Sequence, residues 1–232
     1  MPLNSSSAII VAAGSGLRMN SSVPKQFLTL GEKTVLYHTL QKFLKTPAIS
    51  EIIIVTAPEM ADSELLRMSL PPSSSKPIHI VMGGKRRQDS VYNGLKAVNH
   101  GSAIVSIHDA VRPFIRPETI STAIDLCSQY DGVIVATPTT NTLKEVHDHL
   151  IVKTVNRELI WQAQTPQTFR LAILLKAYEQ AYHDGVTVTD DAGLVERIGG
   201  RIRVIAGDSW NIKITSRQDL ILAQSIFEKG LG

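Results

Sequence analysis

Cysteine is almost absent from this sequence: Cys127 is the single cysteine among 232 residues. One thiol excludes an internal disulfide framework and any zinc site built on cysteines. A chain of this length buries enough surface to fold without such links. We therefore interpret Cys127 as a small buried apolar residue in a helix.

Long hydrophobic runs are also missing. The apolar stretch 8–13 is far shorter than the roughly 20 residues needed to cross a bilayer. The N-terminus has no basic segment followed by a long apolar one, as a secretory signal would have. We therefore expect a cytoplasmic protein without a membrane partner.

Neither sign of charge dominates, and aromatic residues make up only 5% of the chain. Lys and Arg number 24 against 21 Asp and Glu, which gives a net charge of +3. No long basic run is interleaved with aromatic residues, so we expect no nucleic-acid partner. The hydrophobic fraction of 43% excludes intrinsic disorder as the main description of the chain.

What is present is an alternation of short apolar runs and amphipathic stretches. Continuous apolar runs favour buried strands, and apolar residues three or four positions apart favour helices. Strands are predicted at 8–12, 52–56, 78–81, 103–107, 133–136 and 203–205, and helices at 34–44, 89–98, 117–129, 171–183, 190–198 and 216–227. The polar segment 139–156 interrupts this order as a hairpin or arm. The pattern predicts one α/β domain over residues 1–232, with a mostly parallel central sheet and an inserted β-arm at about 139–157.

The residues after each predicted strand are the first place to look for function, because ligands of open α/β sheets bind beyond the carboxyl ends of the strands. After the first strand come Ala13-Gly14-Ser15-Gly16-Leu17-Arg18-Met19 and Pro24-Lys25-Gln26. Glycines with two cations favour a phosphate-binding loop, and a plain turn is the alternative. The dinucleotide fingerprint is excluded because Met19 replaces its third glycine, and a P-loop would need Lys and Ser/Thr after its last glycine.

Charged residues also follow the third and fourth strands. Gly83-Gly84 precedes three adjacent cations at a predicted helix start, where they oppose the helix dipole. We therefore expect an anion or a paired acid beside them. Asp109 ends the fourth strand and suits either Mg²⁺ in a phosphate site or a salt bridge with Arg112. His108 is interpreted as structural.

Taken together, these motifs resemble the 2-C-methyl-D-erythritol 4-phosphate cytidylyltransferase family. The resemblance rests on stretches in the family's order: 12–19 with 24–26, 83–84 with 87–91, 108–113, 164–167, 189–192 and 211–215. Each stretch is a weak signal, but together they span nearly the whole chain and are highly specific.

The resemblance implies a Rossmann-like three-layer α/β sandwich of the nucleotidyltransferase type. It also implies transfer of CMP from CTP to 2-C-methyl-D-erythritol 4-phosphate, with release of pyrophosphate, in the non-mevalonate pathway to isoprenoid precursors. Mg²⁺ would be the cofactor, with another divalent cation as an alternative. The arm would join two chains in a homodimer.

The same resemblance assigns residues to three groups. The catalytic cations would be Arg18, Lys25 and Lys213. CTP would contact Ala12, Ala13, Gly14, Ser15, Gly16, Gly83, Gly84, Ser90, Asp109 and Ala110, and Asp109 would also hold the metal. The polyol phosphate would contact Arg112, Thr142, Arg157, Thr165 and Thr189, with Arg157 serving the site of a second subunit.

The chemistry of the reaction agrees with these residue types. A phosphate monoester is already largely dianionic at neutral pH, so it needs no general base to attack another phosphate. The sequence accordingly offers cations and one key Asp, and no convincing Ser-His-Asp or Cys-His arrangement.

Alternatives stay open at this point. A cytidylyltransferase acting on ribitol 5-phosphate or another polyol phosphate is the nearest, and a non-enzymatic nucleotide-binding module is a second. Lys85 stands where many relatives carry an acid, which leaves the base contacts open. Thr189 is equally an N-cap for helix 190–198. Thr165-Pro166 could be a rigid turn, and Trp161 and Trp210 are interpreted as packing residues.

Overall fold

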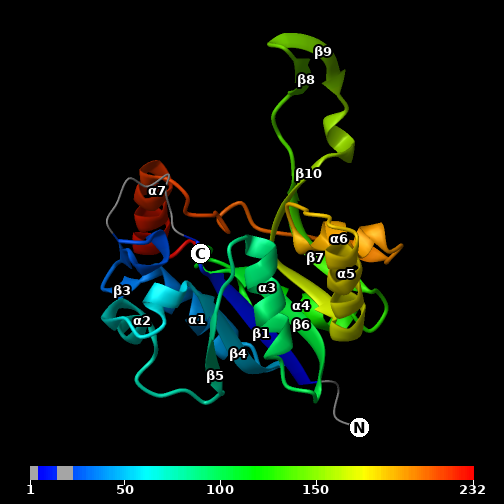
Figure 1. Ribbon diagram of the computed structural model, residues 1–232. Helices are drawn as coiled ribbons and strands as arrows, with labels where there is room; N and C mark the ends of the chain where they lie inside the picture. Colours follow the sequence, from blue (N-terminus) through cyan, green and yellow to red (C-terminus); the bar gives the residue numbers. More distant parts are fainter. Residues whose placement is uncertain (1–4, 15–22) are drawn as a thin grey trace.

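The computed structural model describes residues 5–14 and 23–232, and a seven-stranded sheet runs through this part of the chain (Figure 1). Its strand order is β11-β7-β10-β6-β1-β4-β5. The strands are β1 (Ser5–Ala12), β4 (Ile49–Thr56), β5 (Ile78–Met82), β6 (Ser102–Asp109), β7 (Gly132–Pro138), β10 (Trp161–Arg170) and β11 (Ile202–Ala206). Neighbouring strands are parallel, except that β10 runs antiparallel to both β6 and β7. The mostly parallel sheet expected from the sequence is confirmed.

Helices cover both faces of the sheet. Helices α1 (Val35–Leu44), α2 (Glu64–Ser69) and α4 (Pro117–Leu126) bury their apolar residues in one core cluster, and α3 (Arg87–Lys96), α5 (Leu171–His183) and α6 (Asp191–Arg197) in another. Successive residues of β1 alternate between the two, with Ile10 in the first cluster and Ile9 in the second. This two-sided burial explains why the strand is a continuous apolar run.

The C-terminal helix α7 (Arg217–Glu228) forms a third, smaller core. It packs with Val35, Val111 and Ile214, beside the short strands β2 (Thr29–Leu30) and β3 (Lys33–Thr34). Ser216 and Asp219 cap its start in both directions: the Asp219 N–H donates to Ser216 Oγ at 3.2 Å, and the Asp219 carboxylate accepts the Ser216 N–H at 2.8 Å. This helix brings the preceding segment, which carries Lys213, against the body of the sheet.

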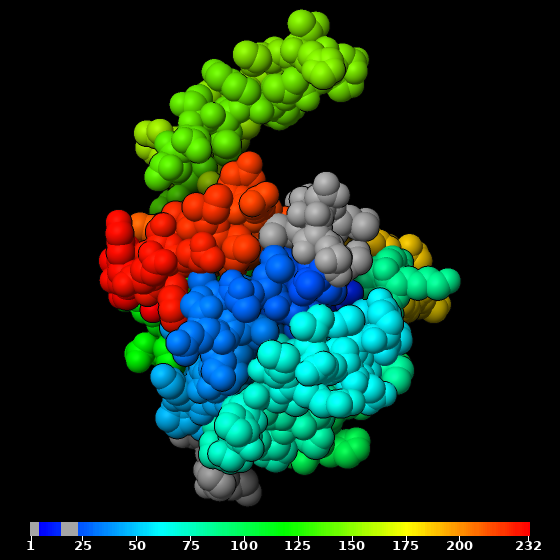
Figure 2. Space-filling model, turned by 90° about the vertical axis from the view of Figure 1, so that its left-hand side faces the viewer, coloured from blue at the N-terminus to red at the C-terminus, as the bar shows by residue number. Residues whose placement is uncertain are grey.

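The arm is a two-stranded antiparallel hairpin that stands away from the body (Figures 1 and 2). Strands β8 (Leu143–His147) and β9 (Leu150–Val155) lie inside the predicted range 139–157, and a 3-10 turn, Arg157–Leu159, follows them. Asp148 and His149 join the strands with φ angles of 47° and 64°, as a tight two-residue hairpin turn requires. The predicted hairpin is confirmed. That residues 1–232 form one domain stays a prediction.

Four expectations need correction or adjustment. No strand was predicted at 161–170, yet β10 lies inside the sheet between β7 and β6. Thr165-Pro166 lies within β10 at a register irregularity and not in a turn. Trp161 and Trp210 are 44% and 37% exposed, so their interpretation as packing residues is wrong. Cys127 is buried as expected, but it lies just past the end of α4, where burial raises its pKa to about 12. Over the described ranges, no helix has the length and apolarity that a membrane span requires.

Candidate active site

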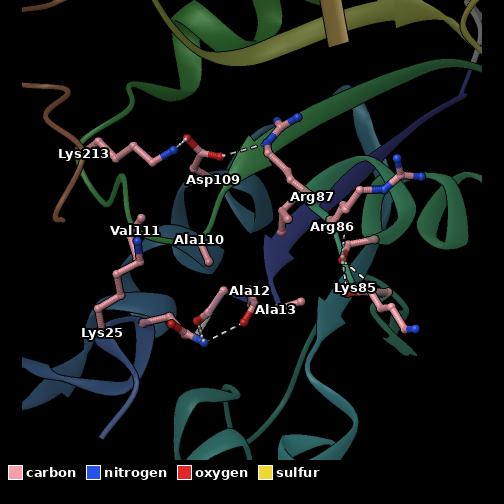
Figure 3. A pocket seen from close by; sticks show the side chains of 15 residues that line it. Ala12, Ala13, Lys25, Lys85, Arg86, Arg87, Asp109, Ala110, Val111 and Lys213 are labelled. Atoms are coloured by element: carbon pink, nitrogen blue, oxygen red, sulfur yellow. Dashed lines mark hydrogen bonds and ion pairs between the residues drawn. The ribbon is translucent and has the colours of Figure 1, made fainter. Parts of the chain in front are cut away.

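A cavity of about 360 Å³ opens at the carboxyl ends of β1 and β6 (Figure 3). The parallel register places Val11 of β1 beside Asp109 of β6, so the two strand ends and the loops after them share one edge of the sheet. The cavity is lined by Val11, Ala12, Ala13, Gly14, Lys25, Gln26, Gly84, Lys85, Arg86, Arg87, Ser90, Asp109, Ala110, Val111 and Lys213. The strand-end rule therefore located the cleft correctly.

The loop after β1 is held in place by a glutamine that sequence reasoning did not single out. Gln26 is buried, and its Nε2 donates to the carbonyl oxygen of Ala12 at 2.6 Å and to that of Gly14 at 3.4 Å. Lys25 precedes it and lies on the side of the cleft that carries Ala110 and Val111 (Figure 3). The predicted residues Ser15, Gly16 and Arg18 lie outside the described residues.

The glycine turn after β5 approaches the β1 loop closely. A Cβ atom added at Gly83 would come within 2.6 Å of the Ala13 Cβ, so a side chain does not fit there. The Ser90 hydroxyl accepts the N–H of Gly84 at 3.0 Å and donates to the Arg86 carbonyl at 3.1 Å. Ser90 thus shapes the turn, and its direct contact with a nucleotide stays a prediction.

The cations after this turn find acidic partners, as expected. Arg86 forms a 2.7 Å ion pair with Asp89, and this hydrogen bond lowers the pKa of Asp89 to about 2. Arg87 reaches deeper and contacts Asp191 at 2.8 Å. Within the described parts of the chain, Lys85 has no ion pair, and it is exposed at the rim of the cavity.

Asp109 is the centre of the charge cluster. Its Oδ2 lies 2.8 Å from Lys213 Nζ and 3.4 Å from Arg112 Nε, and its Oδ1 lies 3.7 Å from Arg87 Nε. Burial alone would raise the pKa of this carboxyl, but the three cations outweigh it and hold the pKa well below its usual range. Asp109 is therefore ionised at neutral pH. The salt bridge with Arg112 considered from the sequence is present.

His108 precedes Asp109 on β6 and is structural, as interpreted. It is fully buried, and burial lowers its pKa to about 4, so the imidazole is neutral at pH 7. Its Nε2 lies 3.0 Å from the carbonyl oxygen of Arg112. Because a carbonyl oxygen can only accept, Nε2 carries the proton.

The segment before α7 is tied to β10 by a buried asparagine that sequence reasoning left without a role. Asn211 Nδ2 donates to Gln164 Oε1 and to the Thr165 carbonyl, each at 3.0 Å, and its own carbonyl accepts Arg112 at 2.8 Å. The Thr165 hydroxyl in turn accepts the backbone N–H of Asp109 at 3.1 Å. These bonds place Lys213 and Asp109 relative to each other. The sequence signal was that Asn211 begins the motif stretch 211–215, two residues before Lys213.

The residues predicted for the polyol phosphate are not brought together in this chain. Arg112 lines a neighbouring cavity of about 450 Å³, which shares Lys213 with the first. Thr142 and Arg157 lie on the arm, beside a separate hollow. Thr189 is exposed and precedes α6, and the proposal that it caps this helix is wrong because Asp190 is the N-cap residue.

Fold and cleft together define a class of protein. Several cations and one carboxylate line a cavity at the strand ends of a Rossmann-like sheet, and no His or Cys is among the described residues that line it. Such a cleft suits a reaction between phosphate groups, in which positioning and charge neutralisation do the catalysis. This is the arrangement of a nucleotidyltransferase.

Comparisons with known proteins give the family. The sequence matches the 2-C-methyl-D-erythritol 4-phosphate cytidylyltransferase (IspD) family over residues 6–229. The protein of that name from Clostridioides difficile (strain 630) is 43% identical over 220 residues, which cover 95% of this chain and 92% of the relative. That of Syntrophus aciditrophicus (strain SB) is 44% identical over 228 residues, 97% of each chain.

A search of solved structures finds the same family. The crystal structure of 4-diphosphocytidyl-2C-methyl-D-erythritol synthase from Anaerococcus prevotii DSM 20548 matches with a TM-score of 0.86 at 33% identity, covering 97% of this chain and 96% of that one. The chain belongs to the 2-C-methyl-D-erythritol 4-phosphate cytidylyltransferase family. The family and the fold class expected from the sequence are both confirmed.

Proposed function

We propose that this enzyme transfers CMP from CTP to 2-C-methyl-D-erythritol 4-phosphate, releasing pyrophosphate and forming 4-CDP-2-C-methyl-D-erythritol for isoprenoid precursor synthesis. Family membership supports the substrates. The observation that carries the mechanism is that Lys25 lines the same cleft as Asp109 and its partners Lys213 and Arg87.

The reaction joins two anions, and that determines what the protein must do. An oxygen of the phosphate monoester attacks the α-phosphorus of CTP, the new P–O bond forms, and the bond to the bridging oxygen of pyrophosphate breaks. The nucleophile is already ionised, so no proton has to be removed first. Lys25 and Lys213 neutralise charge on the reacting phosphates and hold them in line, and Arg18 is assigned the same task.

The nucleotide would occupy the first cavity. The backbone of Ala12, Ala13 and Gly14 can approach the phosphates closely, and Gln26 holds the carbonyl groups of Ala12 and Gly14. The turn at Gly83-Gly84 and the backbone at Ala110 would face the nucleoside. Ser15 and Gly16 are assigned to the same loop by resemblance.

Mg²⁺ fits the donor set of this cleft. Asp109 is ionised, and Mg²⁺ in phosphate sites is typically held by one or two carboxylates together with substrate phosphates. Among residues 5–14 and 23–232, no group of three His, Cys, Asp or Glu side chains could hold a metal without substrate. Asp109 and the triphosphate would therefore hold Mg²⁺ together, and the ion would neutralise phosphate charge when bound.

The acceptor would bind beside Lys213, with Arg112, Thr165 and Thr189 as assigned contacts. Thr142 and Arg157 lie on the protruding arm, so they would serve the cleft of a second chain in a homodimer. Exposed apolar side chains on the arm support such an interface: Leu150 is 74% exposed, Ile151 65% and Leu159 78%. A cytoplasmic location agrees with the single cysteine.

A pyrophosphate-release assay tests the function directly. CTP, UTP, ATP and GTP are each supplied with Mg²⁺ and either 2-C-methyl-D-erythritol 4-phosphate or ribitol 5-phosphate. We expect release with CTP and methylerythritol phosphate, loss of release with EDTA, and recovery with added Mg²⁺. Faster turnover of ribitol 5-phosphate would assign the chain to the other polyol, and undiminished release in EDTA would remove the metal proposal.

A further inference from the structure

A buried carboxylate behind the cleft is not explained by helix formation. Asp191 is 1% exposed and stands in the first turn of α6. The helix is already capped by Asp190, whose carboxylate accepts the N–H of Gly193 at 3.1 Å. Gln167 accepts the backbone N–H groups of Asp191 and Ala192 at 3.0 and 3.1 Å. The Asp191 side chain is thus not needed to cap the helix, and another contact must offset the desolvation of its charge.

That contact is Arg87. One carboxylate oxygen of Asp191 accepts Arg87 Nη2 at 2.8 Å, and the other accepts the hydroxyl of the buried Tyr178 at 2.5 Å. A charge-assisted bond to a carboxylate that is 1% exposed fixes the Nη2 group of the guanidinium. The neighbouring Nε, on the same edge of the guanidinium, faces the cleft and lies 3.7 Å from Asp109 Oδ1, beyond hydrogen-bond distance (Figure 3).

The position of Arg87 decides which oxygen Asp109 can offer. Lys213 and Arg112 both approach Oδ2, at 2.8 and 3.4 Å. For Oδ1, the only ion pair within the described part of the chain is the long one to Arg87. With Asn at 191, only a neutral amide oxygen would compete for the guanidinium, and a guanidinium beside a carboxylate favours a close two-point pair, here with Asp109, that would cover Oδ1.

We propose that Asp191 is a positioning residue of the reaction: it holds Arg87 away from Asp109, so that one oxygen of Asp109 stays open to the metal–nucleotide complex while the Arg87 charge still faces the cleft. This inference rests on the proposed function. It assigns Asp191, which touches neither substrate, an effect on nucleotide binding through Arg87 alone.

The test compares Asp191→Asn with Asp190→Asn. Both variants neutralise an acid at the start of α6, but only Asp191 contacts Arg87. CTP binding in the presence of Mg²⁺ is measured by calorimetry on the full chain, together with the KM for each substrate. We expect Asp191→Asn to weaken CTP binding by about 10-fold or more, as for the loss of a charge-assisted bond. The KM for CTP should rise in parallel, whereas the KM for the polyol phosphate and all parameters of Asp190→Asn should stay near wild type.

A double-mutant cycle shows whether the effect passes through Arg87. In an Arg87→Ala background, Asp191→Asn should weaken CTP binding no further. An equal further loss there, or CTP binding by Asp191→Asn equal to that by Asp190→Asn, would overturn the proposal.

A second variant separates loss of folding from loss of CTP binding. Should Asp191→Asn not fold, Arg87→Lys replaces it, because a single ammonium cannot contact Asp191 and face Asp109 together. The same loss of CTP binding is expected, and wild-type binding by Arg87→Lys would contradict the inference. A wild-type enzyme that binds Mg²⁺ and CTP but does not turn over methylerythritol phosphate would refute the proposed function, while the binding comparison would still decide the role of Asp191.

Discussion

Replacing Lys213 with alanine should lower kcat/KM by about 100-fold to 1,000-fold. The Lys213 ammonium lies 2.8 Å from Asp109 and lines both the proposed nucleotide cavity and its neighbour, so under the proposed function it stands where the two substrates would meet. Removing one positioned donor to developing charge typically costs about 2.7–4 kcal/mol of transition-state stabilisation, which is the source of this range. Pyrophosphate release at saturating and limiting CTP measures the loss.

The structure also predicts that this variant folds. The Lys213 side chain is 37% exposed, and Asp109 keeps Arg112 and Arg87 as partners, so we expect the free energy of unfolding to change by less than about 1 kcal/mol. Lys176→Ala, at an exposed position on α5, is the matched control and should retain full activity. A Lys213→Ala enzyme with kcat/KM within threefold of wild type would refute the electrostatic reasoning.

Three further predictions concern other parts of the molecule. Lys25→Ala should lower kcat/KM by about 100-fold or more in the same assay, and near-normal turnover would remove Lys25 from the mechanism. His108 has a folded-state pKa of about 4, below its unfolded value near 6.5, so the unfolded chain binds a proton first and stability is lost as pH falls through this window. In urea unfolding, the free energy of unfolding should fall by about 2 kcal/mol between pH 7 and 5 because of His108, and His108→Gln should abolish this fall. The same pH dependence of stability in His108→Gln and wild type would contradict the prediction. Charges introduced on the arm by Leu150→Asp and Ile151→Asp should convert a dimer to monomers in sedimentation while CTP binding persists, and a monomeric wild type would exclude the dimer.

Much of the fold could be predicted because its strands are buried on both faces. The continuous apolar runs at 8–12 and 52–56 strongly favour buried strands, and both form strands. Helix starts such as that at Ser216 carry local capping residues. β10 escaped prediction because its residues are polar: Gln167 and Thr168 are buried, yet they resemble a loop in sequence. Their burial is stabilised by partners such as Ser106, 3.0 Å from Thr168, which are far away in the chain.

For the site, the sequence by itself determined which chemistry the cleft could perform. The strand-end rule placed Lys25 and Asp109 at one edge of the sheet, since parallel strands end together, and the family resemblance added Lys213. Only the tertiary structure decided how these charges are partnered. Arg87 bonds with Asp191, 104 residues away, and Arg112 bonds with the Asn211 carbonyl, 99 residues away. Periodicity and spacing report contacts within a helix or strand, whereas the choice of a charge partner depends on which elements the folded chain brings side by side.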